Sequence, residues 1–187
     1  MEKILIHTCC APCLVYVQQE LRNKFEINCY FYNPNIHPYK EFAKRKQALE
    51  KYVELENIFL ISGDYKIDQW FDFLIKDKNS FKQLITDRKN RCMSCYKMRL
   101  RETAEKAKAL GINIISTTLL YSLYQYHDLI KNIGQDIAKE FGLEFYYQDF
   151  REGWQKGFEI YNKTGLYKQN YCACIFSEQE RFNSFQK

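Results

Sequence analysis

Seven of the eight cysteines fall into three groups whose spacing could bind a soft metal. The groups are Cys9-Cys10 with Cys13, the CxxC pair Cys92 and Cys95, and the CxC pair Cys172 and Cys174. Thiolates select zinc, copper(I) or iron–sulfur clusters over hard cations. Because the groups lie far apart in sequence, only folding could bring them together. The eighth cysteine, Cys29, lies inside an apolar run and is expected in the core.

The residues leave three kinds of site open. Four thiolates from two loops can hold a tetrahedral zinc or a [4Fe–4S] cluster. Vicinal Cys9 and Cys10 suit one small ion poorly, whereas the irons of a cluster lie farther apart, so we favour the cluster. A dithiol–disulfide site without metal is the third alternative. Cys13 opens a predicted helix, where the dipole favours a thiolate, and it is either a further ligand or a small buried residue.

The CxC pair is a poor zinc clip by itself. Cys172 and Cys174 could instead close a strained disulfide, and strained disulfides are the readily reduced, catalytic kind. The alternative is that both are additional ligands for the same metal or for a second one.

Three further polar residues follow predicted strands. His37, in the turn 33–38, could donate a proton or bind a phosphate, or it could satisfy local backbone groups. Asp149 could act as an acid or a ligand, and Arg151 as a phosphate clamp. The plain alternative is that the Asp149–Arg151 pair caps a turn.

The net charge of the 187-residue chain is +5, and its distribution is more informative than its size. Basic residues crowd around the CxxC pair: Arg88, Lys89, Arg91, Lys97, Arg99 and Arg101. This field suits an anionic partner such as nucleic acid and would lower thiol pKa values, unless it is only a solvated helix face. Aromatic residues near the predicted site could stack on a base: Tyr32, Tyr39, Tyr167 and Tyr171.

Several classes of protein are disfavoured. Met1–Lys3 leads directly into a short apolar strand, and no apolar run is long enough to span a bilayer, so we expect a cytoplasmic protein without a membrane segment. Reduced cysteines in that compartment are more often metal-binding or catalytic than structural. GxGxxG and Walker A motifs are absent, which argues against a nucleotide cofactor bound in those ways.

The positioning elements alternate between strands and helices. We expect strands at 4–6, 27–32, 57–61, 112–115 and 143–147. We expect helices at 13–23, 39–55, 67–75, 95–110 and 129–141. This alternation predicts one α/β domain over residues 1–187. Its core would be a Rossmann-like, doubly wound parallel sheet of about five strands with helices on both faces.

The topology predicts where the cysteines meet. In such sheets the ligand site lies beyond the carboxyl ends of the strands, where the winding reverses. Cys9 and Cys10 follow the first strand, and Thr117 and Thr118 follow the fourth, which would flank the first. We expect the loop carrying the CxxC pair to fold over this edge, so that all three cysteine groups surround one crevice.

The order of the motifs resembles that of the QueH-type epoxyqueuosine reductases. The motifs are HTCCAPC at 7–13, FYNPNIHP at 31–38, RCMSC at 91–95, DFR at 149–151 and YCACIFS at 171–177. The resemblance runs from the first strand nearly to the end of the chain.

The resemblance implies a tRNA-modifying enzyme that performs the last step of queuosine synthesis. It would reduce the epoxide of epoxyqueuosine to the cyclopentene at the wobble position of tRNAs with GUN anticodons. It also implies an iron–sulfur cluster, with a second iron in some members, and an electron donor that the sequence does not identify. By motif position Cys9, Cys10, Cys92 and Cys95 would be the cluster ligands, with Cys172 and Cys174 as a redox-active pair.

The remaining site expectations follow from the same picture. His37 and Asp149 are the candidate proton donors. The expected tRNA contacts are Arg91, Lys97, Arg99, Arg151 and Tyr32. Two other functions stay open: a zinc-stabilised RNA-binding module without catalysis, and a cluster-free thiol-redox or sulfur-transfer enzyme.

Overall fold

A computed structural model describes residues 1–76, 86–172 and 174–185 of the chain. Its centre is a parallel sheet in the order β3-β2-β1-β4-β5. The strands are β1 (Glu2–His7), β2 (Phe25–Phe31), β3 (Phe59–Ser62), β4 (Ile114–Thr117) and β5 (Glu144–Phe145). Residues 4–6 of β1 are fully buried, as expected for a central strand covered on both faces.

The winding of the sheet reverses beside β1. The chain runs outward from β1 through β2 to β3, then crosses back so that β4 pairs with the other side of β1. Thr117 lies opposite His7 in this register. The predicted five-stranded, doubly wound sheet is therefore confirmed, and its reversal point lies where Cys9 and Thr118 emerge.

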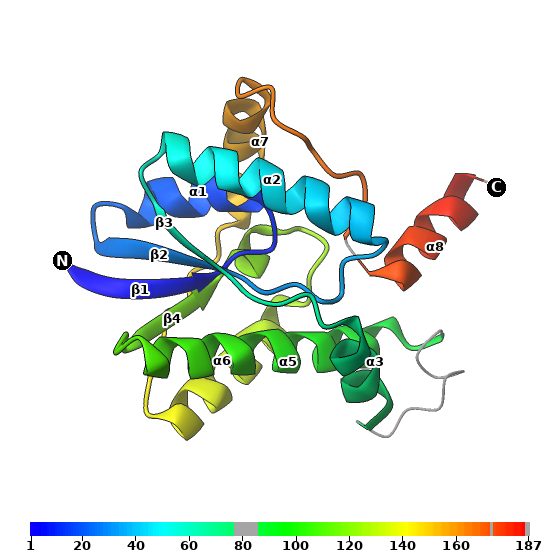
Figure 1. The fold of residues 1–187 in the computed structure, drawn as a ribbon, viewed down its shortest axis with the longest axis horizontal. Helices are drawn as coiled ribbons and strands as arrows, with labels where there is room; N and C mark the ends of the chain where they lie inside the picture. The colour runs from blue at the N-terminus through cyan, green and yellow to red at the C-terminus, as the bar shows by residue number, and fades with distance from the viewer. Residues whose placement is uncertain (77–85, 173, 186–187) are drawn as a thin grey trace.

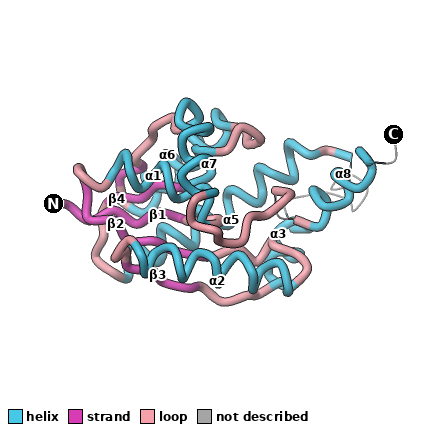
Figure 2. Tube along the Cα trace, turned by 90° about the horizontal axis from the view of Figure 1, so that it is seen from above, coloured by secondary structure: helices cyan, strands magenta, loops and turns pink. Residues whose placement is uncertain are grey.

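Helices cover both faces of the sheet, as expected (Figure 1). One layer holds α1 (Ala11–Leu21), α2 (Tyr39–Leu55) and α7 (Trp154–Asn162). The other holds α3 (Ile67–Lys76), α5 (Arg88–Ala109) and α6 (His127–Phe141). Short 3₁₀ turns, η1 (Thr118–Tyr121) and η2 (Arg151–Gly153), follow β4 and precede α7. The last helix, α8 (Ile175–Phe185), lies at the end of the molecule away from the N-terminus (Figure 2).

The largest difference from the sequence prediction concerns the CxxC pair. Helix α5 begins at Arg88 rather than at Cys95, because the side chain of Asp87 caps it and accepts a hydrogen bond from the Asn90 backbone N–H (3.1 Å). Cys92 and Cys95 therefore lie on the first turns of a helix, and the expected loop does not exist there. Helices α7 and α8 were not predicted, since their apolar periodicity is short and interrupted by polar residues.

Within the described residues, no helix is both long enough and apolar enough to cross a lipid bilayer. The predicted core position of Cys29 is confirmed, because its side chain is fully buried in β2.

Close packing of α6 on β5 yields a stability prediction. A Cβ atom on Gly134 would lie 2.4 Å from the Phe145 ring, far inside van der Waals contact. Replacing glycine by alanine inside a helix ordinarily stabilises it by up to about 1 kcal/mol. Here overpacking, which costs about 1–3 kcal/mol, should reverse the sign. We expect Gly134→Ala to lower the free energy of unfolding in urea, whereas Gln135→Ala, exposed on the same helix, should leave it nearly unchanged. Equal or higher stability of Gly134→Ala would contradict the packing.

Candidate metal centre

The first sulfur group consists of Cys9, Cys10 and Cys13 at the junction of β1 and α1. Their Sγ atoms all lie within 4.8 Å of one another, and those of Cys9 and Cys10 are 3.5 Å apart. Thr118 accepts a hydrogen bond from the Cys9 backbone N–H (3.0 Å) and donates one to its Sγ (3.3 Å). Hydrogen bonds from Cys10 and Cys13 lower the pKa of Cys9, so it is the thiol of this group that ionises first.

The second sulfur group consists of Cys92, Cys95, Cys172 and Cys174. The charges of Cys95, Cys172 and Cys174 all act on Cys92, and Cys174 also acts on Cys95. Two of these residues come from α5 and two from the segment that leads into α8. The CxxC and CxC pairs, about 80 residues apart in sequence, therefore converge in space.

Burial governs the ionisation of Cys92, Cys95 and Cys172. It raises the pKa of Cys92 to about 12 and that of Cys172 to about 11. It also raises the pKa of Cys95, against the opposing effect of Arg99. The expectation that nearby basic residues lower these pKa values is therefore wrong for the metal-free protein, because desolvation of the thiolate outweighs attraction to the guanidinium. A bound metal would supply the missing stabilisation of the thiolates.

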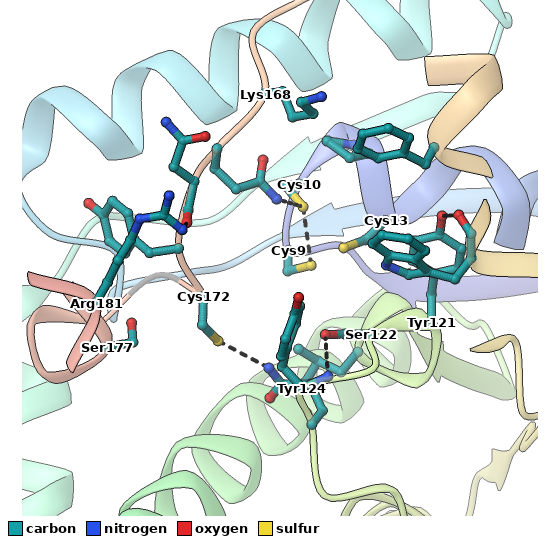
Figure 3. A pocket seen from close by; sticks show the side chains of 18 of the residues that line it. Cys9, Cys10, Cys13, Tyr121, Ser122, Tyr124, Lys168, Cys172, Ser177 and Arg181 are labelled. Atoms are coloured by element: carbon teal, nitrogen blue, oxygen red, sulfur yellow. Dashed lines mark hydrogen bonds between the residues drawn. The ribbon is translucent and has the colours of Figure 1, made fainter. Parts of the chain in front are cut away.

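A cavity of about 490 Å³ opens on both sulfur groups. Cys9, Cys10, Cys13 and Cys172 line it (Figure 3). The remaining described wall is rich in aromatic rings: Tyr121, Tyr124, Trp154, Phe158, Tyr161 and Tyr171. Cations also line it: Arg88, Arg99, Lys168 and Arg181. Such a cavity can hold a planar base against aromatic faces within reach of thiolate-bound metal.

Two amide side chains that sequence reasoning missed contact the thiols. Gln125 donates to the Sγ of Cys172 (3.0 Å), and Gln169 donates to the Sγ of Cys10 (2.8 Å). Each glutamine thus lies on the cavity wall and hydrogen-bonds to one sulfur group. An isolated glutamine outside any motif carries no local signal, so only the folded chain reveals these contacts.

The CxC segment is fixed by a buried arginine of α2. Arg45 donates to the carbonyl oxygens of Tyr171 and Cys172 (both 3.1 Å), and Glu41 holds its guanidinium at 2.6 Å. The hydroxyl of Tyr167 also donates to Glu41 (2.5 Å). This Glu41–Arg45 clamp was also missed, since an i,i+4 pair in a charged helix looks like a surface ion pair.

The predicted proton donors lie apart from the thiols. His37 is buried among the rings of Tyr65, Trp70 and Phe71, and neither of its ring nitrogens has a hydrogen-bond partner among the described residues. Burial lowers its pKa, which favours the neutral ring. Neither His37 nor Asp149 is among the described residues that line the cavity. Their catalytic roles stay predictions that the geometry does not support.

Asp149 and Arg151 pair with each other. The carboxylate accepts from the Arg151 backbone N–H (3.0 Å) and from its guanidinium, whose hydrogen bonds lower the pKa of Asp149 to about 2. This is the turn-capping alternative. The pair precedes α7 at the surface.

Three of the five predicted tRNA contacts are buried. Arg91 is 2 % exposed and ion-pairs with Glu180, Arg99 is 4 % exposed, and Tyr32 is 3 % exposed and stacks on Tyr30. Arg99 lines the cavity, whereas Arg91 and Tyr32 are not among the described residues that line it. Their roles as tRNA contacts stay predictions, which their burial does not support. Position in a basic sequence run does not distinguish a surface arginine from one that a helix turns inward. Lys97 and Arg151 stay predicted contacts.

Comparison with known proteins gives a consistent result. The family model described as "Epoxyqueuosine reductase QueH" matches residues 4–180. Among curated proteins, the epoxyqueuosine reductase QueH of Thermotoga maritima is 37 % identical over 186 residues, which cover 97 % of this chain and 93 % of the relative. The protein of the same name from Dehalococcoides mccartyi is 33 % identical over 96 % of this chain and 94 % of the relative. The one from Staphylococcus aureus is 30 % identical over 98 % and 79 %.

The clamp on the CxC segment can be tested directly. Arg45→Ala removes both hydrogen bonds to that segment and leaves the Glu41 carboxylate without its cationic partner, so we expect a loss of about 3 kcal/mol in the free energy of unfolding. Amide hydrogen exchange at residues 169–172 should accelerate. The matched control is Lys46→Ala, because Lys46 pairs with Glu50 on the surface of the same helix and should change stability by well under 1 kcal/mol. Unchanged exchange in Arg45→Ala would show that the clamp does not position Cys172.

Proposed function

The chain belongs to the epoxyqueuosine reductase QueH family, and we propose that it reduces epoxyqueuosine to queuosine at the wobble position of GUN-anticodon tRNAs with an iron–sulfur cluster bound by its thiolates. The observation that carries the proposal is the aromatic-walled cavity onto which four of the thiols open. Reductive removal of the epoxide oxygen needs two electrons and two protons and leaves an alkene and water. A metal–thiolate centre beside a base-sized cavity suits that reaction.

The donor set fits an iron–sulfur cluster. Seven thiols in two groups exceed the four that a structural zinc requires. We propose that four cysteines, drawn from both groups, bind the cluster: Cys9, Cys10, Cys92 and Cys95. The electrostatic proximity of Cys92, Cys95, Cys172 and Cys174 supports a second division, in which the second group holds the cluster and the first a further iron or a reactive thiol.

The roles of the protein side chains follow from the cavity. Aromatic rings such as Trp154 and Phe158 would stack on the extruded base, as is usual when single-stranded RNA is recognised. The amides of Gln125 and Gln169 can hydrogen-bond either to sulfur or to a polar edge of the base. The walls also displace water, which strengthens electrostatic interactions inside.

When bound, the cluster would supply electrons one at a time. The electron donor is then a separate partner, to be identified by reconstitution. Because tRNA is the substrate, we place the reaction in the cytoplasm. A zinc-stabilised RNA-binding module and a cluster-free thiol-redox enzyme are the alternatives that the following experiments exclude or support.

The first test concerns the metal. Protein purified without oxygen should be brown, contain iron and sulfide in similar amounts, and bleach on reduction. Cys92→Ser should lower the iron content under either ligand division, with Cys29→Ser, whose thiol is buried in β2 and belongs to neither group, as the control. Stoichiometric zinc without sulfide in the wild-type protein would contradict the proposed cluster and favour the RNA-binding module.

The second test separates the ligand divisions. If Cys172 and Cys174 form a redox pair or bind a second iron, Cys174→Ser should keep the cluster spectrum and tRNA affinity but abolish conversion of epoxyqueuosine, measured by mass spectrometry of digested tRNA. Loss of the spectrum in Cys174→Ser, with its retention in Cys10→Ser, would instead assign the cluster to the second sulfur group. Full conversion by both variants would deny either residue a chemical role.

Two exposed cations on the cavity wall, Arg88 and Lys168, should bind tRNA phosphates. Arg88→Ala combined with Lys168→Ala should weaken tRNA binding and reduce the slope of log affinity against log salt by about 1–2, since each lost phosphate contact contributes about 0.7–0.9. The control is Lys3→Ala with Lys24→Ala, because these lysines lie at the amino ends of β1 and β2, opposite the site. Equal salt slopes for the two double variants would show that tRNA does not contact this wall.

A further inference from the structure

Arg99 is a buried cation that joins strand ends to the thiols. It lies on α5 one turn after Cys95, so both side chains share a face of that helix. Its Nη2 donates to Oδ1 of Asn33 (2.7 Å) and its Nε to Nε2 of His7 (3.2 Å). Its Nη1 contacts the Cys95 Sγ at 3.9 Å. The guanidinium therefore lies where β1 and β2 end and α5 begins.

The charge of Arg99 has no carboxylate partner. Among the residues that the structure describes, no Asp or Glu hydrogen-bonds or ion-pairs with it. The groups beside it that can become negative are the thiols of Cys95, Cys9 and Cys172, which a bound metal would ionise. A guanidinium cannot lose its proton in a protein, and an uncompensated buried charge costs several kcal/mol. The compensating charge must therefore come from the sulfur groups.

The other contacts of Arg99 hold it without neutralising it. Nε2 of His7 lies 3.2 Å from both the Arg99 Nε and the Tyr32 carbonyl oxygen, and its Nδ1 hydrogen-bonds the Thr117 hydroxyl (2.9 Å). The ring of His7 is fully buried and lies directly against the guanidinium, which favours its neutral form. Asn33 is also neutral and is fixed by donating to the Thr8 carbonyl (2.9 Å). These neutral partners thus orient the guanidinium without compensating its positive charge. Compensation is left to the sulfur groups.

We propose that Arg99 is the fixed counter-cation of the thiolate centre, a positioning residue that raises the reduction potential of the cluster. The inference rests on the proposed function, which supplies the cluster. Reduction adds one negative charge to the centre. A fixed positive charge nearby stabilises the reduced form more than the oxidised form, and so favours electron uptake from the donor.

The test is the midpoint potential, measured by redox titration of the anaerobic protein. Arg99→Gln keeps hydrogen-bonding capacity and removes the charge. We expect its reduced-to-oxidised ratio at a fixed applied potential to fall about tenfold, which corresponds to about 59 mV for a one-electron couple. Arg99→Lys keeps the charge and should recover most of this shift. Arg101→Gln is the matched control, because Arg101 lies on the same helix but is exposed and paired with Glu140, and its potential should equal that of the wild type.

A second variant guards against failure of Arg99→Gln to fold. Asn33→Asp leaves Arg99 in place and gives it a carboxylate partner at nearly unchanged volume, so it should also lower the potential. Its iron and sulfide content should match that of the wild type.

The outcomes separate the two proposals. An unchanged potential in a loaded Asn33→Asp or Arg99→Gln protein overturns the role of Arg99 and leaves the proposed function standing. An unchanged potential with weakened tRNA binding would make Arg99 a phosphate contact instead. A wild-type protein without iron and sulfide overturns the cluster, and the role of Arg99 with it.

Discussion

The site depends on one buried cation at the reversal point of the sheet. Arg99 hydrogen-bonds His7 at the end of β1 and Asn33 just beyond β2. His7 in turn hydrogen-bonds Thr117 at the end of β4. The three central strands are thus tied together at their carboxyl ends by polar groups that have few alternative partners. Because the same guanidinium also contacts the Cys95 Sγ, Arg99 links the position of the CxxC pair to this edge of the sheet.

A second buried arginine, Arg45, holds the segment that carries Cys172, which Arg99 does not contact. The segment bearing Cys172 leads into α8 and has no strand to hold it, so Arg45 binds its carbonyl oxygens while Glu41 holds Arg45. The cavity wall therefore comes from segments far apart in sequence: the β1–α1 junction, the η1 region, α7 and the residues before α8. None of these segments could form the site alone, since each supplies only part of the cavity lining.

The burial of the thiols is consistent with metal ligation in a member of this reductase family. Burial raises the pKa values of the Cys92, Cys95 and Cys172 thiols, which favours their protonated forms in the metal-free protein. They are consequently poor nucleophiles there, which disfavours cluster-free thiol chemistry and suits metal ligation, because a bound metal displaces the proton. The two cysteine groups leave room for more than one metal–thiolate arrangement beside a single base-sized cavity.

The sequence by itself determined the sheet, its winding, the strand ends that carry Cys9 and Thr118, and the family, because buried parallel strands and clustered cysteines leave local patterns. It also identified the cysteines that converge. Only the tertiary structure decided that Cys92 lies on a helix and that Arg99 and Tyr32 face inward. The contacts of Arg45, Gln125 and Gln169 likewise appear only in the folded chain. The hydrogen bonds of Arg45, Arg99, Gln125 and Gln169 join residues that are 47 to 159 positions apart. A charge in a helix has the same local pattern whether its partner is water or a buried thiolate, so burial and pairing can be settled only when the distant segments pack together.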